Sequence, residues 1–208
     1  MTNFTQYIKQ GEPNQREKAI NWQIAIGLQD VDGLKPSAYL IEQAKANIEG
    51  DITIDEVQNR ITVYYKQPKN RKSYTDRTEE ADKVSAKITK ILAEKTFTLS
   101  LTEFITIHKR LFEEIEPKVA GKIRNYNISK PEWVLDGESV YYSSFENLKE
   151  TLEYDIEQEK KFDYKGLNQQ QIIKHLANFI ANLWQIHIFG EGNTRTIAIF
   201  LIKYLRKL

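Results

Sequence analysis

Near the C-terminal end of the chain, a histidine, a carboxylate, a Gly-Asn pair and an arginine fall within the nine residues 187–195. His187 has the side chain whose unperturbed pKa best suits proton abstraction near neutral pH. Glu191 offers carboxylate oxygens, which Mg²⁺ takes in ones or twos beside substrate phosphates. Arg195 supplies a positive fork that matches phosphate geometry. These residue types at this spacing predict a site that holds a metal-bound polyphosphate and removes a proton beside it.

The backbone of the same loop also suits an anion. Gly192 allows a close backbone approach, and Asn193 and the amides that open the following helix can donate to phosphate oxygens, aided by the helix dipole. Phe189 is expected to plug the loop into the core. A purely structural loop is the alternative, since Glu-Gly-Asn alone is turn chemistry. The combination in this order, between two apolar helices, favours the chemical interpretation.

Helices are predicted on both sides of the loop. Residues 168–186 carry apolar side chains over so wide a face that we expect a central, buried helix, and a last helix is expected from residue 195 to the end. Upstream, strand-forming residues fill 126–142 around Asp136-Gly137. An Asp-Gly pair with such flanks is a strong signal for a β-hairpin, and it is the only clear β element in the sequence.

The rest of the chain shows helical periodicity. Capping boxes are expected at Thr53–Glu56 and Ser100–Glu103. The segment 66–77 is polar and basic without an apolar period, which is typical of a solvated linker. The predicted domains are therefore an N-terminal helical lobe at 1–66, a linker at 67–77 and a core at 78–208.

Composition narrows the class of protein. The 208 residues carry a formal net charge of +1, which gives no electrostatic footprint for direct nucleic-acid or anionic-lipid binding. Cysteine is absent, which excludes disulfides and thiolate zinc sites. The sequence shows neither a signal peptide nor an apolar run that could span a membrane, and it predicts a cytoplasmic protein. His108 and His175 lie among apolar helical residues and are predicted to pack or to lie at the surface.

The loop resembles the signature of Fic-domain proteins, His-x-Phe-x-(Asp/Glu)-Gly-Asn-x-Arg-x-x-Arg. The matching residues are His187, Phe189, Glu191, Gly192, Asn193 and Arg195. Residues 120–124 are similar to the segment that precedes the family's substrate-clamping hairpin, and the resemblance covers 95–208. It implies a mainly α fold, a helical bundle of the Fic type with one β-hairpin flap, here preceded by the N-terminal helical lobe.

The resemblance implies transfer of AMP from ATP to a protein hydroxyl. His187 would deprotonate a Ser, Thr or Tyr of the target, and Glu191 would hold Mg²⁺ between the phosphates. The residues implied to contact the nucleotide are Gly190, Glu191, Gly192, Asn193, Thr194 and Arg195. The flap residues implied to align the target segment by strand pairing are Val140, Tyr141 and Tyr142. The implied partners are a target protein and the nucleotide; a homo-oligomer is left open.

Two positions depart from the family pattern. Ala198 stands where the family has its second arginine, which in relatives holds the terminal phosphate of ATP, and Thr194 replaces the commoner glycine. Another nucleotide or phosphate-containing donor is therefore one alternative. A regulatory module that binds nucleotide with little turnover is the other, although the retained His187 argues against it.

The N-terminal lobe resembles the antitoxin that restrains some Fic proteins. The inhibitory helix of that antitoxin bears (Ser/Thr)-x-x-x-Glu-(Gly/Asn), whose glutamate pairs with the second arginine. In this chain Leu28 takes the place of the hydroxyl residue and Asp32 that of the glutamate; Glu49 is a less favoured candidate. Since Ala198 offers no cation, we expect the lobe not to inhibit through that ion pair. A plain helix stop and turn at Asp32-Gly33 is the alternative.

Overall fold

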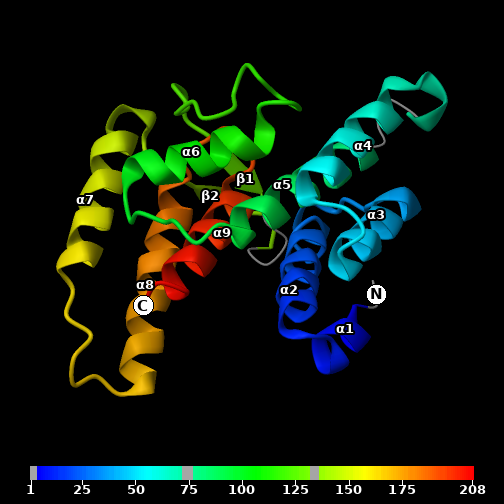
Figure 1. Ribbon diagram of the computed structural model, residues 1–208. Helices are drawn as coiled ribbons and strands as arrows, with labels where there is room; N and C mark the ends of the chain where they lie inside the picture. Colours follow the sequence, from blue (N-terminus) through cyan, green and yellow to red (C-terminus); the bar gives the residue numbers. More distant parts are fainter. Residues whose placement is uncertain (1–3, 72–76, 132–135) are drawn as a thin grey trace. The chain divides into compact units, whose positions relative to one another are not determined.

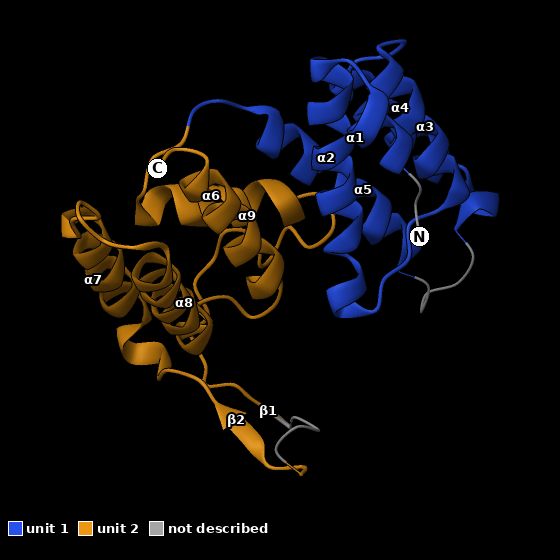
Figure 2. Ribbon diagram, turned by 90° about the horizontal axis from the view of Figure 1, so that it is seen from below, with its two compact units in different colours: residues 1–96 blue, residues 97–208 orange. Residues whose placement is uncertain are grey.

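The structure is a computed structural model that describes residues 4–71, 77–131 and 136–208. Its contacts divide the chain into two compact units, Met1–Thr96 and Phe97–Leu208, which are coloured separately in Figure 2. Helices dominate both units, and the two described strands belong to the second unit (Figure 1). The prediction of a mainly α protein with a single β-hairpin is confirmed.

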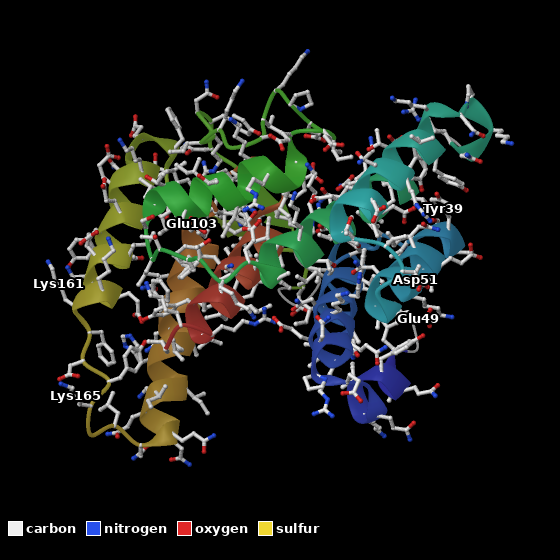
Figure 3. All side chains as sticks on the ribbon, viewed as in Figure 1. Tyr39, Glu49, Asp51, Glu103, Lys161 and Lys165 are labelled. Atoms are coloured by element: carbon white, nitrogen blue, oxygen red, sulfur yellow. The ribbon has the colours of Figure 1, made fainter. Side chains whose placement is uncertain are left out.

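Unit 1 is built around α2, which packs against its neighbours α1, α3 and α5. The helices of this unit are α1 (Thr5–Gln10), α2 (Pro13–Gly27), α3 (Ala38–Glu49), α4 (Ile54–Lys66) and α5 (Thr78–Ala93). Trp22 on α2 is fully buried, and its indole N–H donates to Asn47 Oδ1 over 3.0 Å. Tyr39 on α3, which Figure 3 labels, stacks on Tyr64 of α4, and the ring centres are 4.1 Å apart. Aromatic packing and one buried hydrogen bond thus join α2, α3 and α4.

In unit 1, the start of α4 is capped by neighbouring residues in the sequence, and the start of α3 also bonds to a distant helix. Thr53 and Glu56 form the predicted capping box in front of α4. Ser37 is the N-cap of α3, and both its N–H and its hydroxyl donate to the buried carboxylate of Asp82 on α5. Tyr65 donates to the same carboxylate over 2.7 Å. Asp82 therefore fastens the start of α3 and the end of α4 to α5.

The predicted linker begins within unit 1. Residues Pro68–Asn70 form a 3-10 turn, and residues 72–76 lie outside the described part of the chain. Helix α5 packs against α2 and α4 and so groups with unit 1, whereas the sequence placed it in the core. As an assignment of functional domains, the division 1–66, 67–77 and 78–208 stays a prediction.

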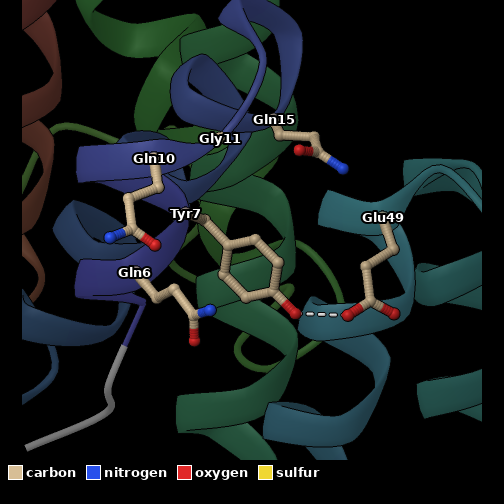
Figure 4. A pocket seen from close by; sticks show the side chains of 6 residues that line it. All are labelled: Gln6, Tyr7, Gln10, Gly11, Gln15 and Glu49. Carbon is tan, nitrogen blue, oxygen red and sulfur yellow. Dashed lines mark hydrogen bonds between the residues drawn. The ribbon is translucent and has the colours of Figure 1, made fainter.

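A polar hollow of about 410 Å³ lies at the surface of unit 1, between α1 and the end of α3 (Figure 4). It is lined by Gln6, Tyr7, Gln10, Gly11, Gln15 and Glu49. The Tyr7 phenol donates to the Glu49 carboxylate, and this bond raises the pKa of Tyr7. Glu49, the second candidate for an inhibitory residue, is therefore engaged within its own unit.

Unit 2 places the loop 187–192 between two of its helices. Its elements are α6 (Leu101–Phe112), β1 (Ser129–Pro131), β2 (Ser139–Tyr141), α7 (Leu148–Lys161), α8 (Gln169–Ile186) and α9 (Asn193–Leu205). Phe104 on α6 stacks on Phe189 of the loop and meets Phe200 of α9 edge-on. Glu159 on α7 is buried. One of its carboxylate oxygens accepts from the Tyr204 hydroxyl of α9, and the other lies 2.6 Å from His175 Nε2 of α8, the same distance as in the first bond. An aromatic core and one buried carboxylate thus fix these helices around the loop.

The expectation that α8 is a buried helix is wrong, because most of its surface is exposed or only partly buried. Its buried side chains are Phe179, Ile180, Leu183 and Ile186, which form one stripe. Ile173 is 57% exposed and Trp184 is 40% exposed. Within unit 2, α8 packs against α7 and α9, which cover one side of it. A wide apolar face in the sequence therefore did not mean that helices surround α8 on all sides.

The hairpin extends away from the helices of unit 2 (Figure 2). Strands β1 and β2 pair antiparallel, with Ser129 opposite Tyr141 and Lys130 opposite Val140. Asp136 and Gly137 both have positive φ, the conformation that favours Asp-Gly in hairpin connections. Residues 132–135, which include three of the strand formers used for the prediction, lie outside the described residues.

Candidate active site

His187 lies at the junction of α8 and the loop. It caps α8 in the left-handed conformation, with φ 48° and ψ 57°, and its N–H donates to the Leu183 carbonyl over 3.3 Å. A residue with a β-carbon rarely adopts this conformation, and such residues concentrate at functional sites. The turn ends the helix and directs the chain into the loop.

The imidazole of His187 is held in its neutral form. Tyr142 stacks on it, with ring centres 4.0 Å apart, and Nδ1 is buried without a hydrogen bond to any described residue. Burial lowers the pKa of His187 to about 4; the Trp184 carbonyl opposes this shift, and the charges of Arg124 and Lys130 add to it. At neutral pH the ring can therefore accept a proton.

Asn193 closes the loop upon itself. Its Oδ1 accepts from the Phe189 N–H over 2.9 Å, and its Nδ2 donates to the Phe189 carbonyl over 2.8 Å. The side chain is 2% exposed. The sequence had assigned this residue to phosphate; in the structure its side-chain amide is already used by the loop. Asn193 thus shapes the loop, while its backbone N–H stays in the first turn of α9.

The two loop glycines lie close to aromatic side chains. Gly192 has φ 75°, and a β-carbon there would lie 2.4 Å from the ring of Phe112. A β-carbon on Gly190 would lie 2.5 Å from the hydroxyl of Tyr126, just ahead of the hairpin. The backbone of the loop therefore passes close to both α6 and the approach to β1.

The start of α9 provides the positive end of the site. Gly192 is the N-cap and has no side chain to occupy the first amides, which an α-helix leaves without intrahelical acceptors. Arg195 is fully buried in this first turn, with its guanidinium carbon 4.8 Å from the centre of the Phe112 ring. Thr194 accepts from the indole N–H of Trp184 over 3.3 Å. The helix start combines the positive end of a dipole, an N-cap without a side chain and a buried cationic residue, features that favour an anion.

His108 supports the loop from α6, a role that the sequence did not predict. Its Nδ1 accepts from the Gly121 N–H over 2.8 Å, so Nε2 carries the proton and donates to the Glu191 carbonyl over 2.9 Å. The ring stacks on Phe189 at 3.7 Å, and burial lowers the pKa of His108 to about 4. The sequence around His108 did not indicate this role, because both hydrogen-bond partners, Gly121 and Glu191, come from other segments of the chain.

The structure brings one of the three flap residues to the base. Tyr142 stacks on His187, whereas Tyr141 is 76% exposed and Val140 pairs with Lys130. Gln185 ties this end of the hairpin to α8: its Nε2 donates to the Tyr141 carbonyl over 2.8 Å, and its carbonyl accepts from the Ser143 N–H over 3.1 Å. The hairpin is thus fastened beside His187.

Glu191 is the residue that could hold a metal ion. Glu191 is exposed to solvent. In the described part of the chain, no three His, Cys, Asp or Glu side chains lie close enough together to hold a metal ion. A divalent cation here would take one carboxylate from the protein and its other ligands from phosphates and water, as Mg²⁺ usually does. The donor set therefore fits Mg²⁺ that arrives with a polyphosphate.

Asp32 lies in unit 1. It ends the 3-10 turn Asp30–Asp32, and Gly33 follows with φ 68° and donates its N–H to the Asp30 carbonyl. This is the geometry of a helix stop followed by a turn. An inhibitory role for Asp32 stays a prediction.

Unit 2 is a helical domain in which a histidine and a helix N-terminus meet in one loop and a hairpin reaches over that histidine. The chain belongs to the Fic/DOC family, whose model matches residues 98–205, more than half of the 208-residue chain. Members of this family are typically transferases that use nucleotide substrates and act on protein targets. No curated protein and no solved structure matches the chain. Among the described helices, none has both the length and the apolar character to cross a membrane.

Proposed function

We propose that the protein transfers AMP from Mg-ATP to a Ser, Thr or Tyr hydroxyl of a target protein and releases pyrophosphate. The observation that carries the proposal is the neutral imidazole of His187 beside the uncapped start of α9, within the segment that matches the family. A neutral base and an anion site are the two elements that such a transfer needs.

The reaction would proceed in one displacement. The target oxygen attacks the α-phosphorus, the bond from that phosphorus to its bridging oxygen breaks, and pyrophosphate leaves with the electron pair. His187 accepts the proton of the target hydroxyl. The amides at the start of α9 and Arg195 stabilise the charge on the phosphates. Mg²⁺, held by Glu191, would supply further charge neutralisation.

Two alternative hypotheses, a different phosphate-containing donor and a nucleotide-binding module with little turnover, are distinguished by the test below. Ala198, half-buried on α9, gives no cation for a terminal phosphate, which favours a shorter or different donor. A nucleotide-binding module without turnover would bind ATP but transfer nothing.

The test uses ATP labelled at either the α- or the γ-phosphorus, with Mg²⁺, the purified protein and a cell lysate as a source of targets. AMP transfer incorporates the α-label and releases the γ-label. Incorporation of the γ-label would instead indicate transfer of a phosphoryl group or of the whole nucleotide, and binding without incorporation would support the module.

Three variants complete the test. His187→Ala is expected to lower incorporation by about 10³-fold or more while nucleotide binding stays near that of the wild type. Glu191→Gln should weaken the dependence on Mg²⁺, and Glu146→Gln, an exposed carboxylate elsewhere in unit 2, serves as its matched control. Full incorporation by a folded His187→Ala protein would exclude the proposal.

A further inference from the structure

Arg124, in the segment between α6 and β1, binds four backbone carbonyls with one side chain. Its Nε donates to the His187 carbonyl over 2.8 Å and its Nη1 to the Tyr126 carbonyl over 2.6 Å. Its Nη2 donates to the Ser143 carbonyl over 2.5 Å and to the Ile186 carbonyl over 3.3 Å. The residue is 4% exposed, so these bonds are made largely out of water. A buried charge needs such partners, because desolvation of an unpaired ion costs several kcal/mol.

These carbonyls belong to three separate places. Tyr126 precedes β1, Ser143 follows β2, and Ile186 and His187 end α8. The guanidinium therefore closes the base of the hairpin and binds it to the negative end of the α8 dipole. The backbone N–H of Arg124 also donates to the Ile188 carbonyl over 3.0 Å. One residue thus connects both ends of the hairpin to the residues on either side of the imidazole.

The position of Tyr142 depends on this connection. Tyr142 lies directly before Ser143, whose carbonyl Arg124 holds and whose N–H donates to Gln185. With Ser143 fixed to the end of α8, the Tyr142 ring rests 4.0 Å from that of His187. The contact between the hairpin and the base therefore reports the state of the Arg124 hydrogen bonds.

We propose that Arg124 is a positioning residue that sets the hairpin at a fixed distance from His187, so that the hydroxyl of a hairpin-bound target segment reaches the base. This inference rests on the proposed function in that it assumes a target held by the hairpin. The guanidinium is directed at backbone carbonyls, so Arg124 acts on the approach of the target and not on the nucleotide. Errors of about 1 Å in such positioning can cost about 10²-fold in rate.

The primary variant is Arg124→Lys in the full-length chain. Lysine keeps the positive charge but has no planar fork, so it cannot serve all four carbonyls. We expect kcat/KM for the target protein to fall by about 10- to 100-fold, with the Kd for Mg-ATP within about threefold of the wild-type value. Arg206→Lys, at an exposed position after α9, is the matched control and should change neither value.

A second readout does not depend on transfer. The stacked Tyr142 ring shields the imidazole protons of His187, so Arg124→Lys should shift their NMR signals toward those of a Tyr142→Ala reference. Gln185→Ala removes the tether to the Tyr141 carbonyl and should produce a smaller shift in the same direction. This exposed substitution keeps the test available if Arg124→Lys fails to fold.

The outcomes separate the two proposals. If the wild type transfers nothing, the proposed function fails, while the NMR shifts still decide the role of Arg124. Unchanged imidazole signals in folded Arg124→Lys and Gln185→Ala, or a target kcat/KM within about twofold of wild type, would overturn the inference. A parallel loss of nucleotide affinity would also overturn it, because Arg124 would then serve the nucleotide.

Discussion

His187 combines a left-handed backbone with a buried ring. The left-handed conformation costs a residue with a β-carbon about 1–2 kcal/mol, and burial of the imidazole disfavours its charged form. The charges of Arg124 and Lys130 act in the same direction as burial and disfavour the imidazolium further. The result is a base that stays unprotonated across the physiological range, at the price of low intrinsic basicity.

This environment predicts an unusual pH profile. Since kcat/KM reports the free enzyme, it should fall as the pH drops through about 4, without an inflection near the ordinary histidine value of 6.5. The inflection in kcat should lie higher, because bound phosphates stabilise the imidazolium. Initial rates at low and at saturating Mg-ATP concentration, each with saturating target, would measure both profiles, with circular dichroism confirming that the protein is folded at each pH. An inflection of kcat/KM near 6.5 would contradict the burial of His187.

Gly192 makes a second prediction at the residue scale. Alanine there meets both a positive φ and the ring of Phe112, so Gly192→Ala should lower the free energy of unfolding by at least about 2 kcal/mol. Gly166→Ala is the matched control, since Gly166 has φ 76° with open space around it, and it should cost only about 1 kcal/mol. Urea unfolding measures both values. Equal losses would show that the contact with Phe112 does not constrain the loop.

At the scale of elements, His108 on α6 makes two neutral hydrogen bonds, one to Glu191 of the loop and one to Gly121 in the segment after α6. Its folded-state pKa of about 4 lies below the ordinary 6.5, so the unfolded chain binds the proton more tightly. The stability that neutral His108 contributes is therefore complete above pH 6.5 and is lost as the pH falls toward 4. The loss for this one residue amounts to about 2–3 kcal/mol.

His108→Gln tests this linkage. A glutamine can accept from Gly121 and donate to Glu191 but does not titrate, so the variant should lose about 2 kcal/mol less than the wild type between pH 7 and pH 4.5. Urea unfolding at the two pH values gives the comparison. His108→Leu, which keeps the volume without the hydrogen bonds, should be destabilised at both. An identical acid loss in wild type and His108→Gln would show that His108 is not the residue responsible.

Features encoded locally were predictable from the sequence. The capping box at Thr53 and the hairpin around Asp136-Gly137 depend on residues a few positions apart. The loop of His187 was found for the same reason, because its residues are contiguous. The roles of His108 and Arg124 were not predictable, since all the hydrogen-bond partners of their side chains except Tyr126 lie 13 to 83 residues away in the sequence. The half-exposed state of α8 depends likewise on which helices pack against it.

At the scale of the whole molecule, the question is whether unit 1 restrains the activity of unit 2. The family match at 98–205 falls inside unit 2, Phe97–Leu208, which has its own aromatic core. Helix α5 has its packing partners α2 and α4 in unit 1, so removal of residues 1–66 would strip it of both. A deletion that tests restraint by the lobe should therefore end at Thr96, where the compact unit ends.

We expect the chain 97–208 to automodify at a rate within about twofold of the full-length protein, because the ion pair that restrains relatives has no cation at Ala198. Asp32→Ala in the full-length chain should likewise leave the rate unchanged, and Asp30→Ala, in the same 3-10 turn, is its control. Thermal unfolding checks that 97–208 is folded. A tenfold or larger rise on both deletion and Asp32→Ala would mean that Asp32 inhibits through another partner. A rise on deletion alone would mean that unit 1 restrains transfer without Asp32, and either result would refute the expectation.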